Sequence, residues 1–371
     1  MKLFTCHHCG QLLYFENIRC ERCGHTVGYL PDRNDLLALT TVEGSINTYA
    51  DSADGNQRYR YCANQAHGAC NWLLPIDSPE EFCVACQLNN TVPNLGNAEL
   101  VQLWRKLEIA KHRLVYTLLQ LGLPVSPRSE ENDTDLAFDF LAEEDATEKV
   151  VMGHANGLIT INVAEADEAK RVQTKKELGE PYRTLLGHFR HESGHYYWDK
   201  LIATSEHRLN EFRNMFGDER ADYAASLKKY YSEGQNVNWS DQFVSLYASA
   251  HPWEDWAETW AHYLHIMDTL ETAHAVGMRV RPAAASQEVK PVAQFKEDPL
   301  MLGNFQQLMD LWVPLTVAVN SLNRSMGQPD FYPFVIPPAV VAKLDFIHQL
   351  CKEVQADVSP QKKKSFLKFW N

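Results

Sequence analysis

Apolar residues first form a long helical stripe after residue 93. Residues 93–96 contain proline and glycine and interrupt the chain. From about residue 98 to residue 121, leucines and a tryptophan recur every three or four positions, which predicts an amphipathic helix. The preceding segment, 1–92, is rich in cysteine and has a polar middle that is typical of loops. We therefore expect a domain boundary near residue 93.

The pattern downstream predicts a hairpin followed by mainly helical structure. Two apolar runs, 149–152 and 157–163, flank an Asn-Gly pair that is typical of a tight hairpin turn. From residue 181 to about residue 275 the pattern is mostly helical. A Pro/Ala-rich stretch, 280–296, predicts a surface loop. Two more helices are expected near residues 300–321 and 338–356.

Composition and charge exclude several classes of protein. The 371 residues, 45% of them hydrophobic, suffice for one large and one small folded domain. No apolar run reaches the roughly 18 residues of a membrane span. The N-terminus meets Cys6 before an apolar signal region can build, so we expect a cytoplasmic protein with no membrane partner. The net charge of −13 argues against a nucleic-acid partner, which would need a basic surface.

Cysteines are concentrated near the N-terminus, where eight of the nine lie between residues 6 and 86. Without a signal peptide, closely spaced cysteine pairs predict metal sites rather than disulfides. The first quartet consists of two CxxC pairs, Cys6, Cys9, Cys20 and Cys23. A glycine follows each pair and permits the tight turn. Four thiolates leave no open position on the metal, so we predict a structural zinc site.

A second quartet is less regular and consists of Cys62, Cys70, Cys83 and Cys86. Only the last two have the CxxC spacing. We expect a second structural four-cysteine zinc site, with His67 as a candidate substitute ligand. The alternative is a half-site beside two free thiols. Zinc ribbons of this kind stabilise small folds or provide docking surfaces for protein partners.

Residues 191–195 read His-Glu-Ser-Gly-His within a segment of helical character. On a helix, His191 and His195 lie on one face, so both imidazoles can reach one metal ion. Glu192 lies beside them, where its carboxylate can accept a proton from a metal-bound water. This arrangement is typical of zinc metallopeptidases, and it makes Glu192 the predicted catalytic base.

A catalytic zinc needs a third protein ligand, and two downstream segments offer one. Asp218 and Asp222 form one pair of carboxylates spaced four residues apart, and Glu254 and Glu258 form the other. In each pair, one acid can bind the metal while the other holds a ligand histidine by its far ring nitrogen. The chemistry of these residues leaves Glu254, Glu258 and Asp218 open as the third ligand.

These motifs resemble those of a bacterial family of zinc-binding metallopeptidases with an N-terminal zinc ribbon. The matching segments are the first cysteine quartet and residues 189–198, 216–223, 251–265 and 323–333. The resemblance covers nearly the whole chain. Together with the patterns above it implies an α+β fold, in which a small β-rich zinc-ribbon domain (1–92) precedes a mainly helical, zincin-like domain (93–371) with a small sheet.

The segment 254–258 also resembles the glutamate helix of lethal-factor-type gluzincins. That resemblance implies Glu254 as the zinc ligand and Glu258 as the support of a ligand histidine. The ligands of the expected catalytic zinc are then His191, His195 and Glu254, in addition to two structural zinc ions in the cysteine quartets.

The resulting hypothesis is a zinc-dependent metallopeptidase that hydrolyses a peptide or protein substrate. A zinc-activated water attacks the peptide bond and Glu192 serves as general base. The alternatives are a non-catalytic, zinc-stabilised protein-binding module and a zinc hydrolase of a non-peptide substrate. During this attack the peptide carbonyl oxygen becomes an oxyanion, which a hydrogen-bond donor would stabilise. Candidate donors are Tyr332, Arg324, His262 and His265.

Overall fold

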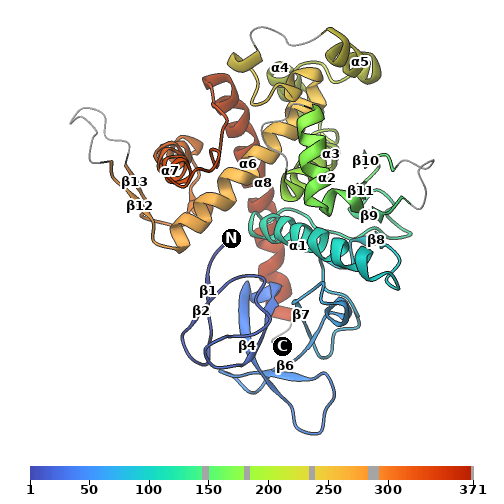
Figure 1. Ribbon diagram of the computed structural model, residues 1–371, viewed down its shortest axis with the longest axis vertical. Coiled ribbons are helices and arrows are strands. Elements are labelled where there is room, and N and C mark those ends of the chain that lie inside the picture. Colours follow the sequence, from blue (N-terminus) through green and yellow to red (C-terminus); the bar gives the residue numbers. More distant parts are fainter. Residues whose placement is uncertain (144–149, 179–183, 234–238, 283–291, 369–371) are drawn as a thin grey trace. The chain divides into compact units, whose positions relative to one another are not determined.

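The structure is a computed structural model that describes residues 1–143, 150–178, 184–233, 239–282 and 292–368. The chain forms two compact units, residues 1–116 with 125–178 and residues 117–124 with 179–371. The first is rich in strands and the second is mainly helical, so the α+β fold class is confirmed (Figure 1). The division at residues 92 and 93, which follows the sequence motifs, stays a prediction.

An antiparallel sheet forms the N-terminal part of the first unit. Its strands are β3 (Thr26–Leu30), β4 (Asp35–Thr41), β5 (Tyr49–Asp51), β6 (Arg58–Tyr61) and β7 (Leu73–Pro75). Their apolar side chains form one core of Leu30, Leu37, Leu39, Tyr59 and Leu73. A Cβ on Gly28 would lie 2.6 Å from the Leu73 side chain, so glycine permits the close packing of β3. A separate hairpin, β1 (Phe4–Thr5) with β2 (Leu12–Leu13), precedes this sheet.

A second sheet in the first unit has the strand order β10, β11, β9, β8. The strands are β8 (Asn89–Thr91), β9 (Ala137–Leu141), β10 (Gly153–Ala155) and β11 (Leu158–Asn162). The predicted hairpin is confirmed: Asn156 and Gly157 have φ of 50° and 82°, as a two-residue hairpin turn requires. Its first strand starts at Gly153 rather than within 149–152, because the turn pairs Ala155 with Leu158.

Two helices complete the first unit, α1 (Ala98–Gln120) and α2 (Glu168–Leu178), although the last residues of α1 belong to the second unit. The predicted amphipathic helix is therefore confirmed to within one residue. Its stripe is buried at Trp104, Leu107, Leu114 and Leu118. Burial of this face stabilises the helix more than its intrinsic propensity does.

The second unit is built around a buried helix. Its helices are α3 (Leu185–Leu201), α4 (Glu206–Phe216), α5 (Tyr223–Glu233), α6 (Pro252–Ala275), α7 (Phe305–Ser325) and α8 (Pro338–Lys368). Helix α6 packs against α3, α4, α7 and α8 (Figure 1). Trp256, Trp260 and Tyr263 on α6 are fully buried. This central position explains why α6 is apolar on several faces.

The structure differs from the predicted elements mainly in the connections. The region 181–275, predicted to be mostly helical, is divided by breaks before α4, α5 and α6. The stretch 280–296 includes parts of a short hairpin, β12 (Arg279–Val280) with β13 (Ala293–Gln294), and its residues 283–291 lie outside the described part. Among the described residues, no helix has both the length and the apolarity to cross a membrane.

Candidate metal centres

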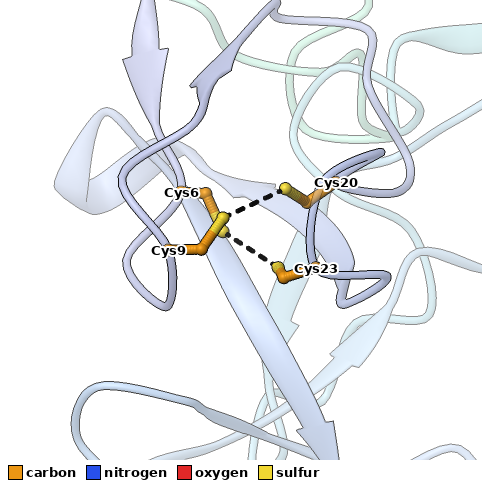
Figure 2. Close-up of side chains that lie close together, drawn as sticks. All are labelled: Cys6, Cys9, Cys20 and Cys23. Carbon is orange, nitrogen blue, oxygen red and sulfur yellow. Dashed lines mark hydrogen bonds between the residues drawn. The ribbon is translucent and has the colours of Figure 1, made fainter.

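The four thiols of the first quartet, Cys6, Cys9, Cys20 and Cys23, converge (Figure 2). The Sγ atoms of Cys6 and Cys23 lie 3.7 Å apart, and those of Cys9 and Cys20 lie 3.6 Å apart. A tetrahedron with zinc–sulfur bonds of about 2.3 Å has edges of about 3.8 Å. These two separations therefore match a four-thiolate zinc site, and all four sulfur atoms lie within 4.8 Å of one another.

Backbone turns hold these thiols in place. Gly10 and Gly24 have φ of 74° and 79°, a conformation that glycine adopts without strain. The Gly10 N–H donates to the carbonyl of Cys6, and the Gly24 N–H donates to the carbonyl of Cys20. Each CxxC pair thus closes a tight turn that directs both thiols to the same side, as the trailing glycines predicted.

The second quartet also converges, and its thiols are all buried. The Sγ atoms of Cys70 and Cys83 lie 3.7 Å apart. A short 3-10 helix, Ala63–His67, spans the loose interval between Cys62 and Cys70. The backbone N–H of Cys83 donates to the Cys62 sulfur at 3.3 Å. His67 is not among the described donors that converge here; its ring packs against Trp104 instead.

Basic side chains of α1 lie beside the second quartet, a feature that the sequence analysis missed. The Cys86 sulfur lies 3.7 Å from Nε2 of His112, whose Nδ1 donates to the carbonyl of Glu108 at 2.6 Å. Lys111 forms a buried ion pair of 2.9 Å with the Glu108 carboxylate. Burial lowers the pKa of His112, but the neighbouring Cys86 outweighs burial and raises it, so His112 can offset part of the charge of four buried thiolates, whereas Glu108 already balances Lys111.

Helix α3 carries the His-Glu-Ser-Gly-His motif. Thr184 begins the helix by accepting a hydrogen bond from the Gly187 N–H at 2.9 Å. One turn apart on this helix, the rings of His191 and His195 have centroids 5.1 Å apart. The helix therefore presents both imidazoles on one face, in agreement with the spacing argument.

Glu254, in the first turn of α6, lies beside these two histidines. His251 caps that helix and Pro252 is its first residue, which places Glu254 in the first turn. Glu254 Oε2 lies 3.1 Å from His191 Nε2, and Glu254 Oε1 lies 3.7 Å from His195 Nε2. All three side chains offer donor atoms within 4.8 Å of one another. Two imidazoles and a carboxylate form a ligand set typical of catalytic zinc.

Glu258, one turn further along α6, fixes the tautomer of His191. Its Oε1 lies 2.7 Å from His191 Nδ1, and its Oε2 accepts a hydrogen bond from Ser245 at 2.5 Å. An ionised carboxylate only accepts hydrogen bonds, so in the neutral imidazole Nδ1 carries the proton and Nε2 keeps a lone pair. This lone pair faces Glu254.

The arrangement fits a bound cation. Glu254 Oε2 is buried and, among the described residues, has no hydrogen-bond partner, although it lies 3.1 Å from His191 Nε2. Two acceptor atoms at this distance repel unless a positive charge, either a proton on His191 or a metal ion, lies near both. A zinc ion bound to both atoms would satisfy them.

The pKa shifts of the three residues are also consistent with a bound cation. Burial lowers the pKa of His191, but the carboxylates of Glu254 and Glu258 outweigh burial and raise it well above its usual value. Burial raises the pKa of Glu254, but His191 outweighs this effect and lowers it to about 2. Burial lowers the pKa of His195, which favours the neutral imidazole that metals bind. The site therefore stabilises positive charge between its donors.

Glu192 follows His191 on α3 and is buried beside the same group of side chains. Its Oε1 lies 3.3 Å from Nε2 of His188, one turn earlier on the helix. Burial raises the pKa of Glu192, but the hydrogen bond to His188 and the nearby histidines outweigh burial and lower it to about 2. The carboxylate is therefore ionised, as a general base must be.

The other candidates from the sequence have different partners. Asp218 is exposed and binds Arg220 through both oxygens, at 2.8 Å each. His262 is buried and bonded to the Tyr332 hydroxyl at 2.5 Å. Arg324 forms an exposed ion pair with Asp330, and His265 is bonded to Arg190.

Several residues near the site were not identified from the sequence. They are His188, Ser245, Tyr247 and Tyr223, the last of which ends the matching segment 216–223 but was given no role. The Tyr223 hydroxyl donates to Glu254 Oε1 at 2.6 Å, and the Tyr247 ring lies 5.9 Å from that of His191. Only tertiary structure brings these residues together, and no spacing rule could have identified them.

Comparison with known proteins gives two matches to families. A family described as "Putative zinc-binding metallo-peptidase" matches residues 100–350, and a zinc-ribbon domain matches residues 3–97. Proteins of Mycobacterium bovis (strain ATCC BAA-935 / AF2122/97) and Mycobacterium tuberculosis (strain ATCC 25618 / H37Rv), each called "uncharacterized protein", are 43% identical to this chain over 360 residues. These alignments cover 97% of this chain and 98% of each relative. No solved structure matches.

Proposed function

Because the chain belongs to the family of zinc-binding metallopeptidases and carries an N-terminal zinc-ribbon domain, we propose that it hydrolyses peptide bonds in a zinc-dependent reaction. The proposed ligands of the catalytic zinc are His191, His195 and Glu254. The observation that supports them best is the convergence of their donor atoms, since the two oxygens of Glu254 lie 3.1 Å from His191 Nε2 and 3.7 Å from His195 Nε2.

The chain's own residues account for the proton transfers. Zinc, when bound, acts as a Lewis acid that lowers the pKa of water toward about 7 and polarises a carbonyl group. Glu192 is ionised and buried beside the proposed ligands. Its carboxylate accepts the proton of the attacking water and later delivers it to the leaving amine. Glu258 and Ser245 keep His191 in the tautomer that leaves Nε2 available.

The remaining parts of the proposal concern the whole protein. The two cysteine quartets hold structural zinc, which stabilises the region of residues 1–92, and residues 93–371 form the catalytic domain. The substrate is a peptide or protein in the cytoplasm. The ribbon surface is a candidate docking site for that substrate or for another protein.

The experiment is a cleavage assay on a peptide library with the parent protein and Glu192→Gln. We expect the parent to cleave peptides and Glu192→Gln to lose about 100-fold or more in kcat while it retains its zinc. The matched control is Glu211→Gln, which changes an exposed glutamate of α4 and should cleave like the parent.

Three outcomes would contradict the proposal. Equal cleavage by Glu192→Gln would remove Glu192 as the base. Absence of cleavage by a zinc-loaded parent would favour a protein-binding module. Cleavage of ester or amide substrates but of no peptide would point to a hydrolase of another class.

A further inference from the structure

Tyr223 joins the metal centre from a different helix. It is the first residue of α5, and Asp222 begins that helix by accepting the Ala225 N–H at 2.9 Å. The Tyr223 ring packs edge-on against His251, with centroids 5.1 Å apart. Its hydroxyl lies 2.6 Å from Glu254 Oε1. Helix start and ring packing together fix where the hydroxyl points.

The hydroxyl distinguishes the two oxygens of Glu254. An ionised carboxylate only accepts, so the tyrosine hydroxyl donates to Oε1. Oε2 accepts no hydrogen bond from the described residues and lies 3.1 Å from His191 Nε2, whereas Oε1 is 3.7 Å from His195 Nε2. One oxygen is therefore bonded to protein and the other is available to a metal.

We propose that Tyr223 is a positioning residue that makes Glu254 a one-oxygen zinc ligand through Oε2. This inference rests on the proposed metal centre. A catalytic zinc has three protein ligands and one open position. A carboxylate that bound through both oxygens would crowd the open position, and the hydroxyl on Oε1 prevents this.

The hydroxyl can be separated from the packing of the ring. Tyr223 is 37% exposed, so its ring is only part of the packing around His251 and Trp253. Tyr223→Phe keeps the ring and removes only the donor. Removal of a hydrogen-bond partner of a metal ligand costs about 10-fold to 100-fold in metal affinity.

The experiment uses the full chain with the zinc ions of the two cysteine quartets left in place. A mild chelator removes metal from the site of His191, His195 and Glu254, here called the open site, and zinc or cobalt(II) is then added back. We expect Tyr223→Phe to bind zinc about 10-fold more weakly than the parent. The cobalt absorption spectrum should weaken and shift, because two-oxygen binding by Glu254 raises the coordination number. The matched control is Tyr231→Phe, which removes the hydroxyl of an exposed tyrosine of α5 and should match the parent.

The possible failures are distinguishable. If Tyr223→Phe keeps both the parent's zinc affinity and its cobalt spectrum while circular dichroism shows a folded chain, the role of Tyr223 is refuted. If the parent gives the same cobalt spectrum as His191→Ala, no metal binds at His191. The proposed metal centre then fails, and the role of Tyr223 fails with it.

Discussion

At the residue scale, His191 contacts two similar glutamates through different ring nitrogens, which supports the different roles proposed for them. Glu258 contacts Nδ1 and is itself fixed by Ser245, whereas Glu254 faces Nε2 and has one oxygen without a hydrogen-bond partner among the described residues. The first contact determines where the proton lies, and the second leaves space for a cation. The resemblance to gluzincins implied the same assignment, whereas the chemistry of the residues alone left it open.

We predict different effects for three carboxylates. Glu254→Gln should abolish metal binding at His191 and His195, because it replaces the charged carboxylate of the proposed third ligand with a neutral amide. Glu258→Gln should weaken binding about 10-fold to 100-fold, since it loses a support of His191. Asp218→Asn should leave binding unchanged, because Asp218 is exposed and paired with Arg220. Zinc titration against a competing chelator measures all three, and equal losses from Glu254→Gln and Asp218→Asn would contradict the assignment.

His188 should act on Glu192 rather than on the metal. The pair is 3.3 Å apart on one face of α3. We expect His188→Ala to lower kcat by about 10-fold, because the carboxylate loses the contact that orients it. Zinc content and KM should change little, and His188→Gln, which keeps a hydrogen-bond donor, should recover part of the rate. A kcat equal to the parent's in His188→Ala would show that the contact has no role in catalysis.

At the element scale, the site depends on how closely α3 and α6 approach. A Cβ on Gly194 would lie 2.9 Å from Ala257 Cα and 3.2 Å from Trp260 Cβ. Two indole groups cross the same contact, since Trp256 donates to the Gly194 carbonyl at 2.8 Å and Trp260 donates to the Ser193 hydroxyl at 3.2 Å. Gly194, the residue directly before His195, is therefore a glycine because a larger side chain would not fit between α3 and α6.

Gly194→Ala should therefore separate the two helices. We expect a loss of about 1–3 kcal/mol in the free energy of unfolding, because the added methyl group meets backbone that cannot move away. Metal affinity at the open site should fall as well, since Glu254 moves with α6. The matched control is Gly303→Ala, where a Cβ meets nothing within 4 Å. Urea unfolding gives the free energy of unfolding of both variants. Equal values for Gly194→Ala and Gly303→Ala would contradict the close approach of α3 and α6 at Gly194.

Sequence patterns predicted elements better than connections. The stripe of α1 and the turn at Asn156 and Gly157 depend on local spacing, and both are confirmed. The breaks between α3 and α6 depend on tertiary packing, which the continuous helical pattern did not reveal. The same limit applies to Tyr223 and His188, because a hydroxyl or an imidazole acquires its role only from the groups folded against it.

At the scale of the whole molecule, we predict metal sites of two kinds. Metal analysis should give about three zinc ions per chain, and His191→Ala combined with His195→Ala should give about two. Cys83→Ser should lose the ion of the second quartet and destabilise the fold, because its thiols are buried. A parent with about one zinc ion would contradict the assignment of the cysteine quartets.

The most direct test is anomalous diffraction at the zinc absorption edge from crystals of the full chain. We predict a peak bonded to Nε2 of His191, Nε2 of His195 and one oxygen of Glu254, with a further position open to solvent. Absence of a peak between these residues would contradict the proposed catalytic centre. A peak held by Glu258 or Asp218 in place of Glu254 would contradict the ligand assignment.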